Sequence, residues 1–246
     1  MILVKSPREI EAMRRAGAVV GRFFEEVRSL ILPGVSTWDL EVFADRFIAR
    51  NGVRSAFKGY MGYPAHLCVS VNEEVVHGIP SKDRVVREGD ILSIDFGIVR
   101  EGFYGDSAMT FPVGAVNEVS SRLLAATERA LAAGIGEVRP GNRLGDVSAA
   151  VQEAAESEGF SVVRDFVGHG IGRSLHEDPQ IPNFGKRGVG PKLMPGMTLA
   201  IEPMVNAGGW HVEVLADADT QPHLHRRLDG GAAHLSIALG RVPVTQ

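Results

Sequence analysis

The sequence predicts one α+β domain built from two similar halves, each with two helices followed by strands. Short matches recur at a fixed offset of 107 residues, so that Pro33-Gly34 returns as Pro140-Gly141. In both halves a glycine, at position 89 or 196, begins a short apolar run that ends on a carboxylate, Asp95 or Glu202. Chance is the alternative, because glycine is common in this chain. Several matches at one offset favour an internal duplication with a pseudo-two-fold axis.

Helical spacing of apolar residues precedes and follows each proline-glycine pair. The predicted helices cover residues 7–30, 37–50, 120–134 and 144–157. Stretches rich in Val, Ile and Phe follow the second helix of each half and are predicted strands. No low-complexity linker separates the halves. We therefore interpret residues 1–246 as one domain, with halves of about 1–110 and 111–216 and an atypical tail over 217–246.

Composition restricts the classes of function. The 246 residues are 44% hydrophobic and 23% charged, as in ordinary globular domains. A formal net charge of −4 predicts no basic surface for nucleic acid or anionic lipid. The single cysteine cannot form an internal disulfide, and no apolar run suits a signal peptide or a membrane span. We expect a cytoplasmic protein with no direct contact to membranes or nucleic acids.

Two carboxylates flank a predicted hairpin. The apolar-rich stretches 90–99 and 103–111 are separated by a short turn that contains glycine. If the turn is centred directly after Arg100, Asp95 lies opposite Asp106, with Cβ atoms about 4.5–5.5 Å apart. Two carboxylates at that distance repel each other unless a cation lies between them. We interpret them as ligands of a divalent metal; solvated acids near a turn are the alternative.

Glu202 and His169 are further candidate ligands. Glu202 ends a mostly apolar strand, where a glutamate is costly unless it is paired or ligating. His169 is flanked by Gly168 and Gly170, which allow close approach of backbone and ligands. A hydrogen-bonded core histidine is the alternative, but the three unexplained acids favour a ligand. Mixed carboxylate and imidazole ligation suits Mn, Co, Fe or Zn, and such sites hydrolyse amides by polarising the carbonyl and activating water.

Two histidines without an evident structural role lie in predicted loops. His77 and His176 could hydrogen-bond a substrate or a tetrahedral intermediate, although polar residues at loop ends are the alternative. Other motifs are not matched. Position 180 is Gln180 rather than a second zincin histidine, and there is no G-x-S-x-G elbow or P-loop.

Seven runs of residues together resemble the type I methionine aminopeptidases. They are 62–64, 70–80, 89–95, 105–108, 166–173, 176–183 and 196–204. The resemblance covers residues 1 to about 217 and implies the pita-bread fold, two divalent metal ions and removal of the initiator methionine. It also implies nascent polypeptide N-termini as partners and a monomeric protein, and it leaves contact with the ribosome open.

The resemblance implies a role for each matching position. The implied metal ligands are Asp95, Asp106, His169 and Glu202, and Glu202 is also the implied proton shuttle. The implied contacts to substrate and intermediate are His77 and His176. The implied methionine pocket contains Tyr60, Tyr63 and Cys68, together with Phe57 and Leu175, whose side chains differ from the commonest choice in the family.

The resemblance breaks in the tail. The family's fifth ligand is a glutamate that bridges both metals, but no glutamate follows Glu213, and the tail lacks strand alternation. The other ligands could still hold one ion, so the sequence leaves one or two metal ions per chain open. His234 or Asp229 as a replacement ligand, and a short frame change in the coding sequence, are further alternatives.

These observations favour a metal-dependent aminopeptidase that removes the initiator methionine. A catalytically weakened or silent pita-bread protein that binds a peptide or partner is the main alternative, because the last glutamate is missing. A prolidase-like or creatinase-like enzyme is disfavoured, since such relatives usually carry a large additional N-terminal domain.

Overall fold

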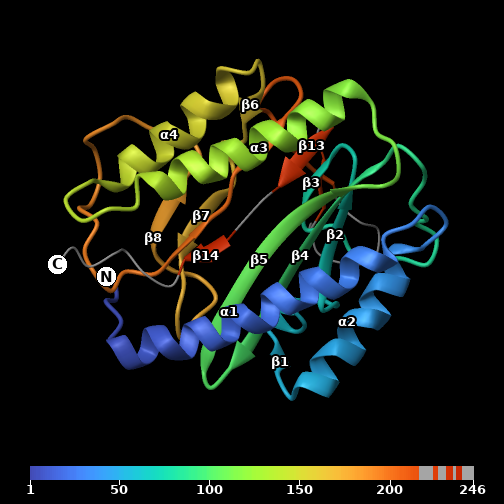
Figure 1. Cartoon of the computed structure of the whole chain (residues 1–246), viewed down its shortest axis with the longest axis horizontal. Helices are drawn as coiled ribbons and strands as arrows, with labels where there is room; N and C mark the ends of the chain where they lie inside the picture. Colours follow the sequence, from blue (N-terminus) through green and yellow to red (C-terminus); the bar gives the residue numbers. More distant parts are fainter. Residues whose placement is uncertain (216–223, 227–230, 235–236, 240–246) are drawn as a thin grey trace.

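The computed structural model describes residues 1–215, 224–226, 231–234 and 237–239 (Figure 1). Asp229 and most of the atypical tail therefore lie outside the described residues. Helices cover two opposite sides of the molecule, and the strands lie between them (Figure 1). Within the described part of the chain, no helix has the length and apolar character needed to cross a membrane.

The first half contains α1 (Pro7–Val27), a 3-10 turn η1 (Arg28–Leu30) and α2 (Thr37–Asn51). Both helices begin with a capping box, at Ser6 for α1 and Ser36 for α2, which satisfies the first backbone amides. The strands that follow are β1 (Arg54–Ser55), β2 (Leu67–Val71), β3 (Glu74–Val76), β4 (Ile91–Arg100) and β5 (Phe103–Pro112), with a 3-10 turn η2 (Tyr60–Gly62) before β2. One antiparallel sheet has the order β1-β4-β2, and β5 pairs with β4.

The second half contains α3 (Glu118–Gly136) and α4 (Leu144–Glu156). Its strands are β6 (Ser161–Val162), β7 (Val167–Gly170), β8 (Glu177–Pro182), β9 (Leu199–Ile201), β10 (Met204–Asn206) and β11 (Glu213–Leu215). The four predicted helices are thus confirmed, with boundaries that differ by a few residues.

The duplication is visible in backbone details at the same offset. The isolated bridge between Ser36 and Val85 recurs between Arg143 and Lys192, each position shifted by 107. Gly34 and Gly141 both have a φ of 96°, a left-handed conformation that glycine adopts without steric cost. The repeated proline-glycine pairs therefore mark equivalent turns in the two halves.

The tail contributes three short strands, contrary to the expectation from its lack of alternation. They are β12 (Leu224–Arg226), β13 (Ala232–His234) and β14 (Ile237–Leu239). β12 lies between β11 and β3, β13 pairs with β10, and β14 pairs with β9 in the sheet of order β14-β9-β7-β8. Backbone hydrogen bonds to existing sheet edges do not require an alternating sequence, so the pattern alone was misleading here.

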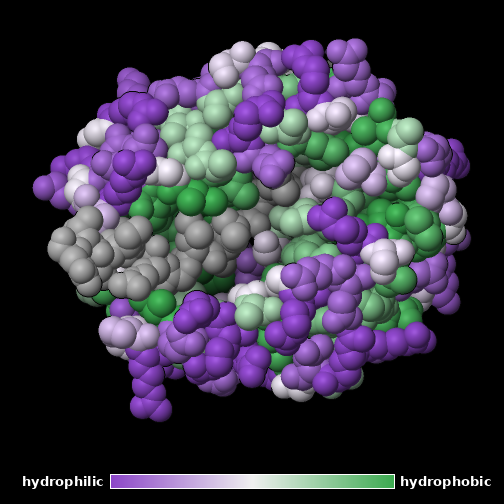
Figure 2. Space-filling view, viewed as in Figure 1, coloured by the Kyte–Doolittle hydropathy of each residue, from purple (hydrophilic) through white to green (hydrophobic). Residues whose placement is uncertain are grey.

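The apolar faces of the helices pack on the sheets. In the first half, Phe23 of α1 stacks on Phe96 of β4 with ring centroids 3.8 Å apart. Polar residues cover the outer sides of the helices, whereas apolar residues gather in the hollow between the two helical layers (Figure 2).

Candidate metal centre

The hairpin of β4 and β5 supplies Asp95 and Asp106, but in a different register from the predicted one. Asp95 is paired with Ala108, and Asp106 with Gly97. The predicted pairing was wrong because the turn is centred on residues 101 and 102, whose φ values of 53° and 78° are those of a two-residue hairpin turn. The two aspartates are therefore diagonal neighbours, which still share one face of the sheet.

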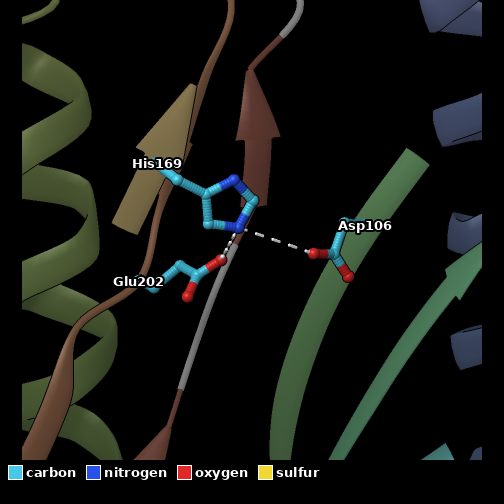
Figure 3. A group of neighbouring side chains, drawn as sticks. All are labelled: Asp106, His169 and Glu202. Carbon is cyan, nitrogen blue, oxygen red and sulfur yellow. Dashed lines mark ion pairs between the residues drawn. The ribbon is translucent and has the colours of Figure 1, made fainter. Parts of the chain in front are cut away.

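Asp106, His169 and Glu202 converge from three separate segments: β5, β7 and the residue after β9 (Figure 3). Each offers one ligand atom, and these atoms all lie within 4.8 Å of one another. His169 Nε2 lies 3.2 Å from Glu202 Oε1 and 3.9 Å from Asp106 Oδ2. Among the described residues, Asp95 is outside this three-residue group but borders the same pocket.

The local backbone explains why glycines flank His169. A Cβ on Gly168 would lie 2.3 Å from the carbonyl oxygen of Ala200, and one on Gly170 would lie 2.1 Å from that of Asp178. The neighbouring strands thus approach β7 too closely for any other residue. His169 Nδ1 lies 2.8 Å from the Gly170 carbonyl oxygen, an acceptor, so the neutral ring carries its proton on Nδ1 and leaves the Nε2 lone pair for a cation.

The pKa values show how unfavourable these buried charges are without a cation. Burial, followed by the charges of Asp106 and Glu202, raises the pKa of Asp95 well above its usual range. Burial and the charge of Glu202 raise the pKa of Asp106 to about 7. Burial lowers the pKa of His169, but the hydrogen bond and charge of Glu202 outweigh it and raise that pKa to about 9.

The donor set fits a divalent metal. The Oδ1 atoms of Asp95 and Asp106 are buried and have no hydrogen-bond partner among the described residues. Carboxylates placed together in this way ionise readily only when a cation neutralises them. Two carboxylates and an imidazole suit the transition metals rather than calcium.

All the residues assigned to metal ligation, substrate contacts or the methionine pocket border one pocket of about 450 Å³, whereas the side chain of His234 lies outside the described part of the chain. They are Phe57, Tyr60, Tyr63, Cys68, His77, Asp95, Asp106, His169, Leu175, His176 and Glu202. The sequence analysis missed five further lining residues, Met61, Val76, Phe166, Val167 and Met204. Met204 could have been found, because it lies two residues after Glu202 and side chains two apart in a strand face the same way.

The lining residues play different parts. The Tyr63 hydroxyl lies 2.9 and 3.1 Å from the carbonyl oxygens of Leu67 and Gly78, to which it can donate. Its ring therefore lines the pocket while its hydroxyl is bonded to the backbone behind it. Burial raises the pKa of the Cys68 thiol, which therefore acts as a small apolar group. His77 has a left-handed φ of 65°, a strained conformation of the kind that clusters at functional sites.

His176 lies beside the metal-binding group. Its ring centroid is 4.3 Å from that of His169, and its Nδ1 is 2.8 Å from the Tyr60 hydroxyl. Burial and the neighbouring His169 lower the pKa of His176, so its ring is neutral at physiological pH. A neutral imidazole can donate one hydrogen bond to a substrate oxygen without carrying a charge into the pocket.

Comparison with known proteins agrees with this geometry. Residues 11–235 match Metallopeptidase family M24. The chain is 52% identical over 217 residues to methionine aminopeptidase 1 of Bacillus subtilis, covering 88% of this chain and 87% of that one. It is 40% identical to the methionine aminopeptidase of Escherichia coli, covering 96% and 90% of the two chains.

Solved structures show the same architecture. The methionine aminopeptidase of Thermotoga maritima superposes with a TM-score of 0.93 at 49% identity, over 97% of this chain and 94% of that one. The prolidase of Pyrococcus furiosus, at 20% identity and a TM-score of 0.73 over 99% and 66%, shares the pita-bread fold alone. The chain therefore belongs to metallopeptidase family M24 and, within it, to the methionine aminopeptidases.

Proposed function

We propose that this chain is a metal-dependent aminopeptidase that removes the initiator methionine from nascent polypeptides. The observation that carries the proposal is the convergence of Asp106, His169 and Glu202 in a pocket with largely apolar walls. Relatives that are about half identical over most of the chain and are named methionine aminopeptidases support the choice of substrate.

Asp106, His169 and Glu202 would hold one divalent ion of the Co, Mn, Fe or Zn class, and Asp95 with Asp106 would contribute to a second. A bound ion polarises the scissile carbonyl and lowers the pKa of water. Glu202 is the proposed proton shuttle, because it is less buried than Asp106 and stands in the metal-binding group next to the pocket. It would receive a proton from the attacking water and return it to the leaving amine.

The pocket walls suit the methionine side chain of the residue that would be removed. Phe57, Tyr63, Cys68 and Leu175 are all less than a tenth exposed and present ring, thiol and aliphatic surfaces. An unbranched thioether chain fits such a surface, since methionine is flexible and makes favourable contacts between sulfur and aromatic rings. His176 would donate to the substrate carbonyl or the intermediate, and His77 would contact the substrate from another wall.

The setting of the reaction is part of the proposal. Nascent N-termini are available in the cytoplasm, which we propose as the location of the enzyme. Contact with the ribosome and a monomeric state are further expectations that follow from the substrate and the family.

One sequence feature favours a second candidate, a silent protein that binds peptides. No glutamate follows Glu213, so a bridging ligand of the family has no direct counterpart. The two candidates differ in turnover and not in fold.

The deciding experiment is a titration of the metal-free protein with Mn(II) and with Co(II), measuring methionine release from the peptide Met-Ala-Ser. We expect methionine release that rises with occupancy of at least one tight site and is lost in Glu202→Gln. Folded protein that binds the peptide but releases no methionine at saturating metal would establish the silent alternative.

A further inference from the structure

His176 is connected by one side chain to a distant segment that lines the same pocket. The Tyr60 hydroxyl lies 2.8 Å from His176 Nδ1, although the two residues are 116 positions apart. Their rings are 5.4 Å apart and tilted by 40°, so the contact is a hydrogen bond at the ring edges and not a stack. Tyr60 is 37% exposed, which places this bond at the mouth of the pocket.

The segment that carries Tyr60 is built to hold the side chain in place. The Tyr60 amide donates to the Phe57 carbonyl at 2.8 Å, and its own carbonyl accepts from the Tyr63 amide at 2.9 Å. Gly59 and Gly62, on either side, have φ values of 87° and 84°, which glycine alone adopts freely. The short turn η2 is therefore fixed at both ends.

Met61 shows that this turn is strained. Its φ is 47°, a left-handed conformation that a residue with a side chain adopts at a cost. The residue is 81% exposed, so burial of its side chain does not account for the conformation. The residue next to it in this turn, Tyr60, lies within hydrogen-bond distance of His176. Backbone strain of this kind clusters at functional sites.

His176 is restrained from its own side as well. Leu175 before it is buried, and the carboxylate of Glu177 after it accepts from the backbone amides of Arg173 and Ser174 at 2.8 and 3.1 Å. The backbone around His176 is thereby anchored, but the imidazole can still rotate about its side-chain bonds. The His169 ring packs against the imidazole with centroids 4.3 Å apart, and the Tyr60 hydroxyl adds a directional hydrogen bond that opposes this rotation.

We propose that Tyr60 is a positioning residue: its hydroxyl donates to His176 Nδ1, fixes the imidazole orientation and keeps the proton on Nε2. A neutral imidazole has one N–H and one lone pair, so a donor at Nδ1 selects the tautomer with hydrogen on Nε2. Nε2 then becomes a hydrogen-bond donor, the form needed to stabilise a developing oxyanion. Burial raises the pKa of Tyr60, which keeps its hydroxyl protonated and able to donate.

The expected effect of Tyr60 on turnover rests on the proposed function. Its expected effect on the orientation and tautomer of the His176 ring does not. Phe in place of Tyr60 keeps the aromatic surface and removes only the hydroxyl. Loss of one neutral hydrogen bond that orients a catalytic donor is expected to lower kcat by about 3- to 10-fold. KM should change by less than about two-fold, because the apolar surface facing the substrate is kept.

The test is a double-mutant cycle with Tyr60→Phe and His176→Ala, assayed by methionine release from Met-Ala-Ser. If Tyr60 acts through His176, Tyr60→Phe lowers kcat in the wild-type background and has no further effect beside His176→Ala. Ser157→Ala, which removes an exposed hydroxyl that donates to the Ala154 carbonyl at the end of α4 and does not line the pocket, is the control and should leave kcat unchanged. An equal loss in both backgrounds, or no loss in either, would overturn the proposal.

A second measurement does not depend on turnover. Nitrogen-15 NMR of the Zn(II)-loaded protein reports which imidazole nitrogen carries the proton, with the His176 signal assigned by its absence in His176→Ala. We expect hydrogen on Nε2 in the wild type and a mixture of tautomers in Tyr60→Phe. The same tautomer in both proteins would contradict the positioning role. A wild type without turnover would count against the proposed function, while the NMR result would still decide the role of Tyr60.

Discussion

Lys5 and Glu177 form an ion pair whose side chains are only 6% and 5% exposed, although 172 positions separate them in the chain. The Lys5 backbone amide also donates to the Gly196 carbonyl at 2.8 Å. A Cβ on Gly172 would lie 2.4 Å from Lys5 Cε, so the lysine side chain would have to shift to admit it. The N-terminal segment is thus packed tightly against the loop that leads to His176.

Lys5→Met should be strongly destabilising, because it leaves the Glu177 carboxylate buried without its cation. Breaking one partner of a buried pair costs about 3–5 kcal/mol of unfolding free energy, whereas removing both partners together costs less. Urea denaturation of Lys5→Met and of Lys5→Met/Glu177→Met would measure the difference. Arg15→Met is the control, since it breaks a solvent-exposed ion pair with Glu101, which contributes little to stability. Equal effects of Lys5→Met and Arg15→Met would contradict this account.

The two hairpin aspartates should differ in their effect on the first metal ion. Asp106 belongs to the group with His169 and Glu202, whereas Asp95 lies outside it. Asp106→Asn should therefore weaken binding of the first Mn(II) by more than about 100-fold, beyond the usual cost of losing a residue that only supports a ligand. Asp95→Asn should change it by less than about 10-fold. Equilibrium dialysis measures both affinities, and a larger loss in Asp95→Asn would show that the tight site is built on the other aspartate.

Much of the fold and site could be predicted because the signals are local or periodic. Helix boundaries follow apolar spacing and caps, and the duplication follows from a constant offset. The hairpin register could not be predicted, because the turn centre depends on which residues take left-handed φ values, and Glu101 does so beside Gly102. An error of one position in the turn centre changed the partner of Asp95 by two residues.

Contacts between distant segments were beyond the sequence pattern. Nothing near Lys5 indicates that it pairs with Glu177, and nothing near Tyr60 indicates that its hydroxyl meets His176. Both contacts arise only when loops from different parts of the chain pack together. The tail strands were missed for a related reason, since β13 and β14 pair with the distant strands β10 and β9, and β12 pairs with β3 as well as β11.

The metal-free protein should lose stability as pH rises from 6 to 9. Asp106 has a folded-state pKa of about 7, above its usual 3.8, and His169 one of about 9, above its usual 6.5. Both groups hold their protons more tightly when folded, so the stability they contribute is present at low pH and is lost as pH rises through the folded values. A tenfold gain in proton affinity on folding corresponds to about 1.4 kcal/mol, and because the two groups interact we expect a net loss of about 2 kcal/mol or more.

A bound divalent ion should remove this pH dependence, because it replaces the protons as the source of positive charge. Urea denaturation at pH 6 and pH 9, with EDTA or with Mn(II), gives the four free energies required. In Asp106→Asn the slope of the metal-free protein should become shallower. A metal-free protein that is more stable at pH 9 than at pH 6 would show that the carboxylates are already ionised in the fold.

Any side chain at Gly105 should destabilise the protein, because α1 lies directly on β5 at this point. A Cβ on Gly105 would lie 2.9 Å from the carbonyl carbon of Ala16 and 3.1 Å from the Gly17 nitrogen, both backbone atoms that cannot move without the helix. Gly105→Ala should therefore lower the unfolding free energy by about 1–3 kcal/mol. It should also weaken Mn(II) binding, since any shift of β5 displaces the neighbouring ligand Asp106.

Gly17→Ala is the matched control for that substitution. Gly17 lies on the exposed side of α1, and a Cβ there would meet nothing within 4 Å. Alanine in a helix interior is favoured over glycine by about 0.5–1 kcal/mol, so this variant should be slightly more stable with unchanged metal affinity. Urea denaturation and Mn(II) dialysis of the two variants distinguish a steric cause from a general preference at glycine positions. If Gly105→Ala were as stable as Gly17→Ala, α1 could be displaced from β5 without cost, and the close packing would not be what holds Asp106 in place.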